Sequence, residues 1–170
     1  MKMDMLSIGG LGHKQTIYQS FCASDTATRQ ALTDLSQKLQ EFGVDSDEVE
    51  KVETILAEVY NNIVEHAFSG VAPGVVRSRM TVVDAALKCL VADNGRPLPE
   101  SGLPAGNLVG PATCRKDLPE GGFGWFLIRH LTRQLYHQRV GGTNYLEFVI
   151  PFEEPAKCPT ALRVRTRLCD

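Results

Sequence analysis

Three polar side chains at helical spacing could carry chemistry in this chain. Glu58, Asn62 and His66 stand at positions i, i+4 and i+8, so they would form one stripe along a helix, at the border of its apolar face. An amide oxygen in such a stripe can ligate a hydrated Mg²⁺ ion, and a carboxylate one turn away can orient or deprotonate a nucleophile. The alternative is a solvated helix border, which is the usual place of such residues.

A second candidate is an acidic residue at the end of an apolar run. Asp93 ends this run, and Gly95 follows two positions later. A carboxylate at a strand end can accept a hydrogen bond from an exocyclic amine such as that of adenine, and a glycine lets a planar base approach the backbone. The alternative is an ordinary turn, because Asp-Asn-Gly is a common turn sequence.

A glycine cluster before an apolar helical pattern is the third candidate. Gly121, Gly122 and Gly124 surround Phe123 at the start of this pattern. Backbone N–H groups in such a cluster can point at an anion, and the following helix N-terminus adds positive partial charge. The cluster is not a P-loop, because no Gly-Lys-Ser/Thr sequence follows, and it is not a dinucleotide fingerprint, because no strand directly precedes it.

The elements that would position these residues follow from changes of period along the chain. Alternating patterns indicate strands, and apolar residues three and four apart indicate helices. In chain order, the predicted elements are a strand over 14–23, a helix over 25–42, a helix from 45 to 67, strands over 75–83 and 87–92, a helix that includes Leu131 and Leu135, and strands over 136–140 and 143–152. Asp45 and Glu48 have the spacing of a capping box at the start of the second helix.

The order of these elements predicts an α+β fold, a two-layer sandwich with helices on one face of a mixed, largely antiparallel sheet. Residues 94–122 are rich in glycine and proline, and an unpatterned segment of that length usually has a function, so we expect it to cover a ligand. We expect three parts: a flexible N-terminus over 1–13, one domain over 14–152, and a tail over 153–170 of undefined role.

Composition narrows the class of protein. The chain has 170 residues, of which 43% are hydrophobic and 22% charged, as expected for one soluble domain. Its net charge of −2 argues against nucleic acid as the main partner. No segment approaches the roughly 18 apolar residues of a membrane helix, so we expect a cytoplasmic protein without a membrane partner.

Taken together, the three candidate motifs resemble those of a known superfamily. Residues 58–67 are similar to the N-box, residues 93–97 to the G1 box, and residues 121–128 to the G2 box of the GHKL ATPases, which have the Bergerat or histidine-kinase-like fold. Within this superfamily the chain most closely resembles the stand-alone anti-sigma-factor serine/threonine kinases, and residues 141–146 fit their last hairpin. One departure is Pro97, where many relatives have a second G1 glycine.

This resemblance implies ATP and Mg²⁺ as cofactors and a role for each motif residue. Asn62 would ligate Mg²⁺, and Glu58 would be the catalytic base toward a protein hydroxyl. Asp93 and Gly95 would hold the adenine, whereas His66 would be structural. The other implied nucleotide contacts are Gly121, Gly122, Phe123, Gly124 and Thr143.

The resemblance also implies the partners. The phospho-acceptor would be a Ser or Thr of a small anti-sigma-factor antagonist protein, and the kinase would also hold a sigma factor and form a homodimer. The alternative is a non-catalytic, nucleotide-switched module that binds a partner through the same fold. Glu58 favours the kinase, because a module that only binds needs no base one turn before the metal ligand.

Overall fold

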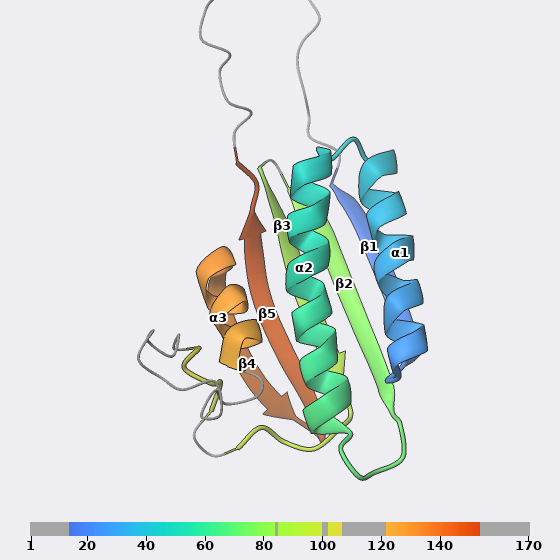
Figure 1. Ribbon diagram of the computed structural model, residues 1–170, viewed down its shortest axis with the longest axis vertical. Coiled ribbons are helices and arrows are strands. Elements are labelled where there is room, and N and C mark those ends of the chain that lie inside the picture. Colours follow the sequence, from blue (N-terminus) through green and yellow to red (C-terminus); the bar gives the residue numbers. More distant parts are fainter. Residues whose placement is uncertain (1–13, 84, 100–101, 107–121, 154–170) are drawn as a thin grey trace, which may run out of the picture.

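The computed structural model describes residues 14–83, 85–99, 102–106 and 122–153, and three helices cover one face of its sheet (Figure 1). The strands are β1 (Gln15–Cys22), β2 (Val75–Val83), β3 (Ala86–Asp93), β4 (Arg133–Val140) and β5 (Thr143–Pro151). Their spatial order is β1-β2-β3-β5-β4, and every neighbouring pair is antiparallel. The predicted two-layer α+β sandwich is therefore confirmed. The segment 1–13, most of the expected covering loop and the tail from residue 154 lie outside the described residues.

The helical layer consists of α1 (Asp25–Glu41), α2 (Ser46–Asn62) and α3 (Gly122–Leu131). In Figure 1, α2 crosses the middle of the sheet, with α1 on the β1 side and α3 on the β4–β5 side. Its apolar residues recur at helical spacing, so a single face of α2 enters the core. The largest fully buried side chains come from all three helices and from β2, β3 and β5: Leu35, Leu39, Val52, Ile55, Leu56, Val59, Tyr60, Met80, Leu87, Ile128, Phe148 and Ile150. No helix among the described residues has the length and apolarity that a bilayer span requires.

The second predicted helix changes its geometry before it ends. The α-helix stops at Asn62, and a π-helix, η1 (Ile63–Ala67), carries the chain to the predicted end. A contact with the turn after β3 holds this wider segment, because the Arg96 N–H donates to the Ala67 carbonyl at 2.9 Å. A π-turn holds more residues than an α-turn, so His66 does not continue the stripe of Glu58 and Asn62 at α-helical spacing.

The third predicted helix is shorter than its apolar spacing indicates. We expected Leu135 on this helix, but α3 ends at Leu131 and β4 begins at Arg133. The Thr132 side chain caps the last turn by donating to the Ile128 carbonyl, and Gln134 has a φ of 54°, which a continuing helix excludes. Leu135 packs against the core from the strand. The element predicted for this leucine was therefore wrong.

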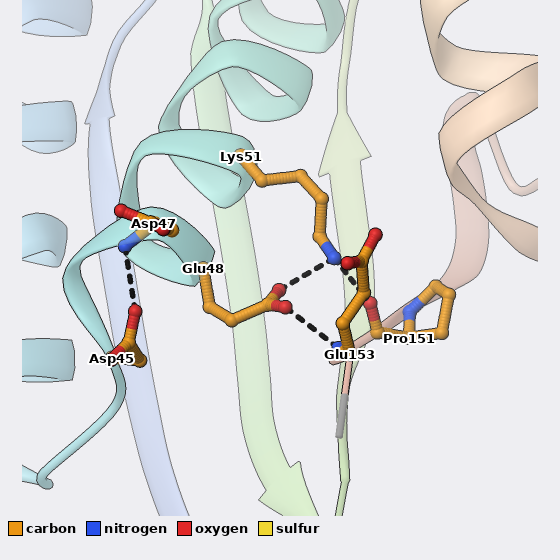
Figure 2. Close-up of polar contacts among 6 residues, drawn as sticks. All are labelled: Asp45, Asp47, Glu48, Lys51, Pro151 and Glu153. Carbon is orange, nitrogen blue, oxygen red and sulfur yellow. Dashed lines mark hydrogen bonds and ion pairs between the residues drawn. The ribbon is translucent and has the colours of Figure 1, made fainter. Parts of the chain in front are cut away.

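The capping box predicted at the start of α2 forms only in part (Figure 2). The Asp45 carboxylate accepts from the Asp47 N–H at 3.0 Å and so caps the helix. Glu48 does not reach back to the cap. Its carboxylate accepts from the Glu153 N–H at 2.7 Å and pairs with Lys51 Nζ at 2.5 Å, and Lys51 Nζ also donates to the Pro151 carbonyl at 2.8 Å. Glu48 and Lys51 therefore connect the end of β5 to the first turns of α2 through polar contacts.

We expect Glu48→Gln to lower the free energy of unfolding by about 1–2 kcal/mol. The glutamine amide has only one oxygen to accept from the Glu153 N–H and from Lys51 Nζ, and the half-buried Lys51 loses its anionic partner. The side chains of Glu48 and Lys51 are only 12% and 19% exposed, so solvent screens this pair weakly. Chemical denaturation measures the effect. The matched control is Glu41→Gln, which breaks the exposed Lys38–Glu41 pair and should leave the midpoint unchanged. Equal midpoints for Glu48→Gln and the wild type would contradict this role.

Candidate functional site

One cavity of about 510 Å³ brings together residues that lie far apart in the sequence. It lies between the end of α2 with η1, the carboxyl end of β3, α3, and the strands β4 and β5. Its walls are mainly apolar: Val59, Ile63, Ala67, Val91, Pro97, Leu98, Pro99, Leu103, Pro104, Trp125 and Leu146. Its polar lining consists of Asn62, His66, Asp93, Arg96, His137 and Asn144. Asn62 and Asp93, predicted from two separate motifs, therefore meet in one cavity.

Asp93 is buried, and neighbouring donors orient its carboxylate. Its Oδ1 accepts from the Gly95 N–H at 2.8 Å and from Asn144 Nδ2 at 2.9 Å. Asn144 is held in turn, since its Nδ2 donates to the Arg96 carbonyl at 2.9 Å and its Oδ1 accepts from Arg139 at 2.6 Å. Among the described residues no group donates to Asp93 Oδ2. This oxygen is therefore a pre-oriented acceptor for a donor that enters the cavity.

Gly95 has a role that differs from the predicted approach of a planar base. A Cβ at this position would lie 2.6 Å from the Ala67 Cβ and 2.7 Å from the Ala67 carbonyl oxygen. The missing side chain therefore lets the π-turn pack onto the turn after β3, which brings Asn62 and Asp93 to the same cavity. The resemblance predicted Gly95 as a contact with adenine, and this remains a prediction.

We expect Gly95→Ala to cost about 1–3 kcal/mol of folding free energy, because the added methyl group overlaps backbone atoms that cannot move independently. ATP affinity should fall with it, since η1 and the turn after β3 form part of the cavity. Thermal unfolding and nucleotide titration measure the two effects. The control is Gly43→Ala, which has no atom near its Cβ position and lies outside the cavity, so it should keep the ATP affinity although its φ of 80° strains a side chain. A Gly95→Ala protein that keeps both properties would contradict the packing role.

Asn62 presents one free atom that suits a cation. Its Nδ2 donates to the Glu58 carbonyl at 2.6 Å, one turn earlier in α2. This bond fixes the amide so that Oδ1, an oxygen ligand of the kind that Mg²⁺ takes, remains available. No cluster of three or more His, Cys, Asp or Glu side chains that could hold a metal occurs among the described residues. A metal at Asn62 would therefore depend on other oxygen ligands, such as phosphates and water.

Glu58 lies beside the cavity and against the first turn of α3. A Cβ on Gly124 would lie only 2.2 Å from Glu58 Oε2, so the glycine is what allows the carboxylate to approach α3 so closely. Glu58 is half-buried and stands one turn before Asn62. The predicted pair of carboxylate and amide is therefore adjacent in space, with only the amide in the cavity lining.

The remaining predicted contacts lie in different places. Gly122 is the first residue of α3, and Gly121 lies outside the described residues. Phe123 is 62% exposed, stacks on Phe126 and does not line the cavity.

Asn144, and not Thr143, is the cavity residue at the start of β5. The reason is strand register. Asn144 pairs directly with Asp93 of β3, so both side chains lie on the helix-covered face of the sheet, and the preceding residue points to the opposite face.

The sequence did not single out His137 as a site residue. It lies on β4 opposite Leu146 of β5, and both residues line the cavity. Burial lowers the pKa of His137, the charge of Asp93 opposes this shift, and the charge of Arg139 adds to it. The alternation of β4 was visible in the sequence, but only its pairing with β5 shows which face His137 occupies.

Comparison with known proteins places this architecture in a family. The model of the histidine kinase-like ATPase domain matches residues 21–150, more than half of the chain. The chain belongs to the histidine kinase-like ATPase family. The GHKL resemblance of its motifs is thereby confirmed. No curated protein shows significant sequence similarity to it.

The chain is similar to two solved structures. The structure of the RsbU and RsbW domains of Rv1364c from Mycobacterium tuberculosis superposes with a TM-score of 0.55 at 17% identity, covering 84% of this chain and 34% of that chain. The EL346 blue-light activated histidine kinase of Erythrobacter litoralis gives a TM-score of 0.45 at 21% identity, covering 72% of this chain and 41% of that chain. The ATPase domain thus spans about a third of the first of these chains, and that likeness concerns the fold alone.

Membership of the histidine kinase-like ATPase family implies that the domain binds ATP, and the residues of the cavity fit that ligand. Oδ2 of the buried residue Asp93 is an acceptor without a protein donor among the described residues, as an exocyclic amine requires. The apolar walls suit the two faces of a planar base, and the volume is in the range of small-molecule sites. Asn62 Oδ1 lies in the same lining and suits a hydrated cation.

Proposed function

We propose that this ATPase domain is a serine/threonine protein kinase that acts in the cytoplasm as an anti-sigma regulatory factor. The observation that carries the proposal is the placement of Glu58. Its carboxylate is held against α3 at Gly124, one helical turn from the candidate metal ligand Asn62. A domain that only binds nucleotide has no chemical need for a carboxylate at this position.

The residues of the site would divide the work of phosphoryl transfer. Bound ATP supplies the phosphoryl group that is transferred. Asp93 and the apolar walls would hold the base, and Asn62 Oδ1 would ligate Mg²⁺, which would neutralise phosphate charge. Glu58 accepts the proton of an incoming Ser or Thr hydroxyl. Backbone N–H groups in the first turn of α3 offer positive partial charge to phosphate oxygens, so positioning and electrostatics provide most of the catalysis.

The proposal extends to the partners that the motif resemblance implies. The phosphorylated protein is a small anti-sigma-factor antagonist, and the kinase, as a homodimer, holds a sigma factor when the antagonist is released. The fold likeness to a structure that contains an RsbW domain is compatible with this role. Its support is the motif resemblance, because a likeness at 17% identity concerns the fold alone.

Acid-stable labelling of a partner protein tests this function. The purified protein is incubated with γ-labelled ATP and an extract of cells that encode it, and labelled proteins are treated with acid and, separately, with alkali. Phosphoserine and phosphothreonine resist acid, whereas phosphohistidine loses its label. An acid-stable label on a small protein is expected. Acid-labile label would make the protein a histidine kinase, and ATP binding without any transfer would support the non-catalytic module.

We expect Asn62→Ala to remove most of the gain in ATP affinity that Mg²⁺ provides, because the variant lacks the amide oxygen that would ligate the ion. Affinity for ATP in the presence of a chelator should change little, since Asp93 and the apolar walls remain. Calorimetric titration with and without Mg²⁺ measures both values. Asn61→Ala is the matched control, because Asn61 is the exposed neighbour on the same helix. An unchanged Mg²⁺ dependence in Asn62→Ala would contradict the role as a metal ligand.

A further inference from the structure

His137 is a half-buried polar residue that the proposed mechanism does not use. It projects from β4 into the cavity lining, near Asp93 and Arg139. Its Nε2 is buried and has no hydrogen-bond partner among the residues that the structure describes. Buried polar atoms in native proteins are nearly always paired, so an unpaired one inside a ligand cavity indicates a missing partner.

The donors around Asp93 show what that partner needs. The Gly95 N–H is used by Asp93 Oδ1. Both hydrogens of Asn144 Nδ2 are used, one by Asp93 and one by the Arg96 carbonyl. The free atom of Asp93 is an acceptor, so among the cavity-lining side chains of β3, β4 and β5 the imidazole of His137 is the group that can still donate to a ligand.

A 6-aminopurine presents the complementary pattern. Its amino group is a donor, and a ring nitrogen next to it, N1 or N7, is an acceptor. A carboxylate alone satisfies only the donor, and a ring nitrogen that loses water without gaining a hydrogen bond weakens binding. A neutral imidazole carries one N–H and can donate it to that ring nitrogen.

We propose that His137 is a second base-reading residue, which donates a hydrogen bond to a ring nitrogen of the adenine whose amino group is held by Asp93. This inference rests on the ATP binding of the proposed function and deepens it. Burial keeps the imidazole neutral, as the lowered pKa of His137 indicates. The two residues would recognise the base together: Asp93, at the end of β3, would accept from the amino group, and His137, on β4, would donate to the ring nitrogen.

A cycle of ligand and protein variants tests the pairing. The affinities of ATP, 1-deaza-ATP and 7-deaza-ATP are measured for the wild type, His137→Phe and His137→Gln. We expect the wild type to lose about fivefold to tenfold in affinity for one of the two analogues, the value of one neutral hydrogen bond. His137→Phe should lose a similar factor for ATP and show no further loss with that analogue. His137→Gln keeps an N–H donor and should recover part of the affinity.

Gln138→Phe is the matched control, because this residue is the next on β4 and pairs with Tyr145 on the opposite face of the sheet. It should bind all three nucleotides like the wild type. Equal affinity of the wild type for ATP and both analogues would overturn the role of His137. This comparison uses the wild type alone, so it does not depend on whether the variants fold. The role would also be overturned if the analogue penalty persisted unchanged in His137→Phe. A folded wild type that binds no ATP would overturn the proposed function itself, and the base-reading role with it.

Discussion

Asp93→Asn will weaken ATP binding about a hundredfold and leave the fold intact. Asparagine keeps an oxygen for the Gly95 and Asn144 donors, so the network around the turn can persist. The freed position then carries an NH₂ group in place of Oδ2, and two donors face each other where the base amine should bind. Calorimetric titration of ATP without Mg²⁺ isolates this effect from any metal contribution.

Asp34→Asn is the control for this experiment, since Asp34 is an exposed residue of α1 whose carboxylate accepts a hydrogen bond from Gln30. Both variants should unfold at the temperature of the wild type to within a few degrees. ATP affinity within about threefold of the wild type in Asp93→Asn would show that the free Oδ2 does not hold the base, because one lost hydrogen bond already costs more. The cavity would then need another mode of base recognition.

Glu58→Gln will lower the rate of phosphate transfer by a factor of about 10² to 10⁴, with little change in ATP affinity. The amide has the shape of the carboxylate and fits against Gly124 in the same way, but it cannot accept the proton of a hydroxyl. The assay follows label transfer from ATP to the acid-stable product at saturating nucleotide. ATP affinity is measured on the same preparation.

Glu50→Gln removes an exposed carboxylate from the same helix and serves as the matched control for Glu58→Gln. It should transfer phosphate at the rate of the wild type. A Glu58→Gln protein that retains full transfer would exclude Glu58 as the base. A loss of transfer together with a loss of ATP binding would mean that the carboxylate organises the start of α3 and has no chemical role.

The main elements of the fold could be predicted from the sequence because each has a strong local pattern. The alternation of β1, the short β-branched or apolar runs of β2 and β3, and the apolar face of α2 predicted these elements to within a few residues. Leu135 shows the limit of this reasoning. Its spacing from Leu131 suits a helix, but a leucine in a strand can bury the same side chain, and local spacing does not distinguish the two.

The sequence by itself determined the fold class, the helix that carries Glu58 and Asn62, and the acidic end of β3, because these depend on residues close together in the chain. Only the tertiary structure decided which residues complete the cavity. Pairing of β5 with β3 places Asn144, and not Thr143, opposite Asp93, and pairing of β4 with β5 brings His137 beside them. Strand register is set by contacts between distant segments, and a shift of one residue would turn every side chain to the other face.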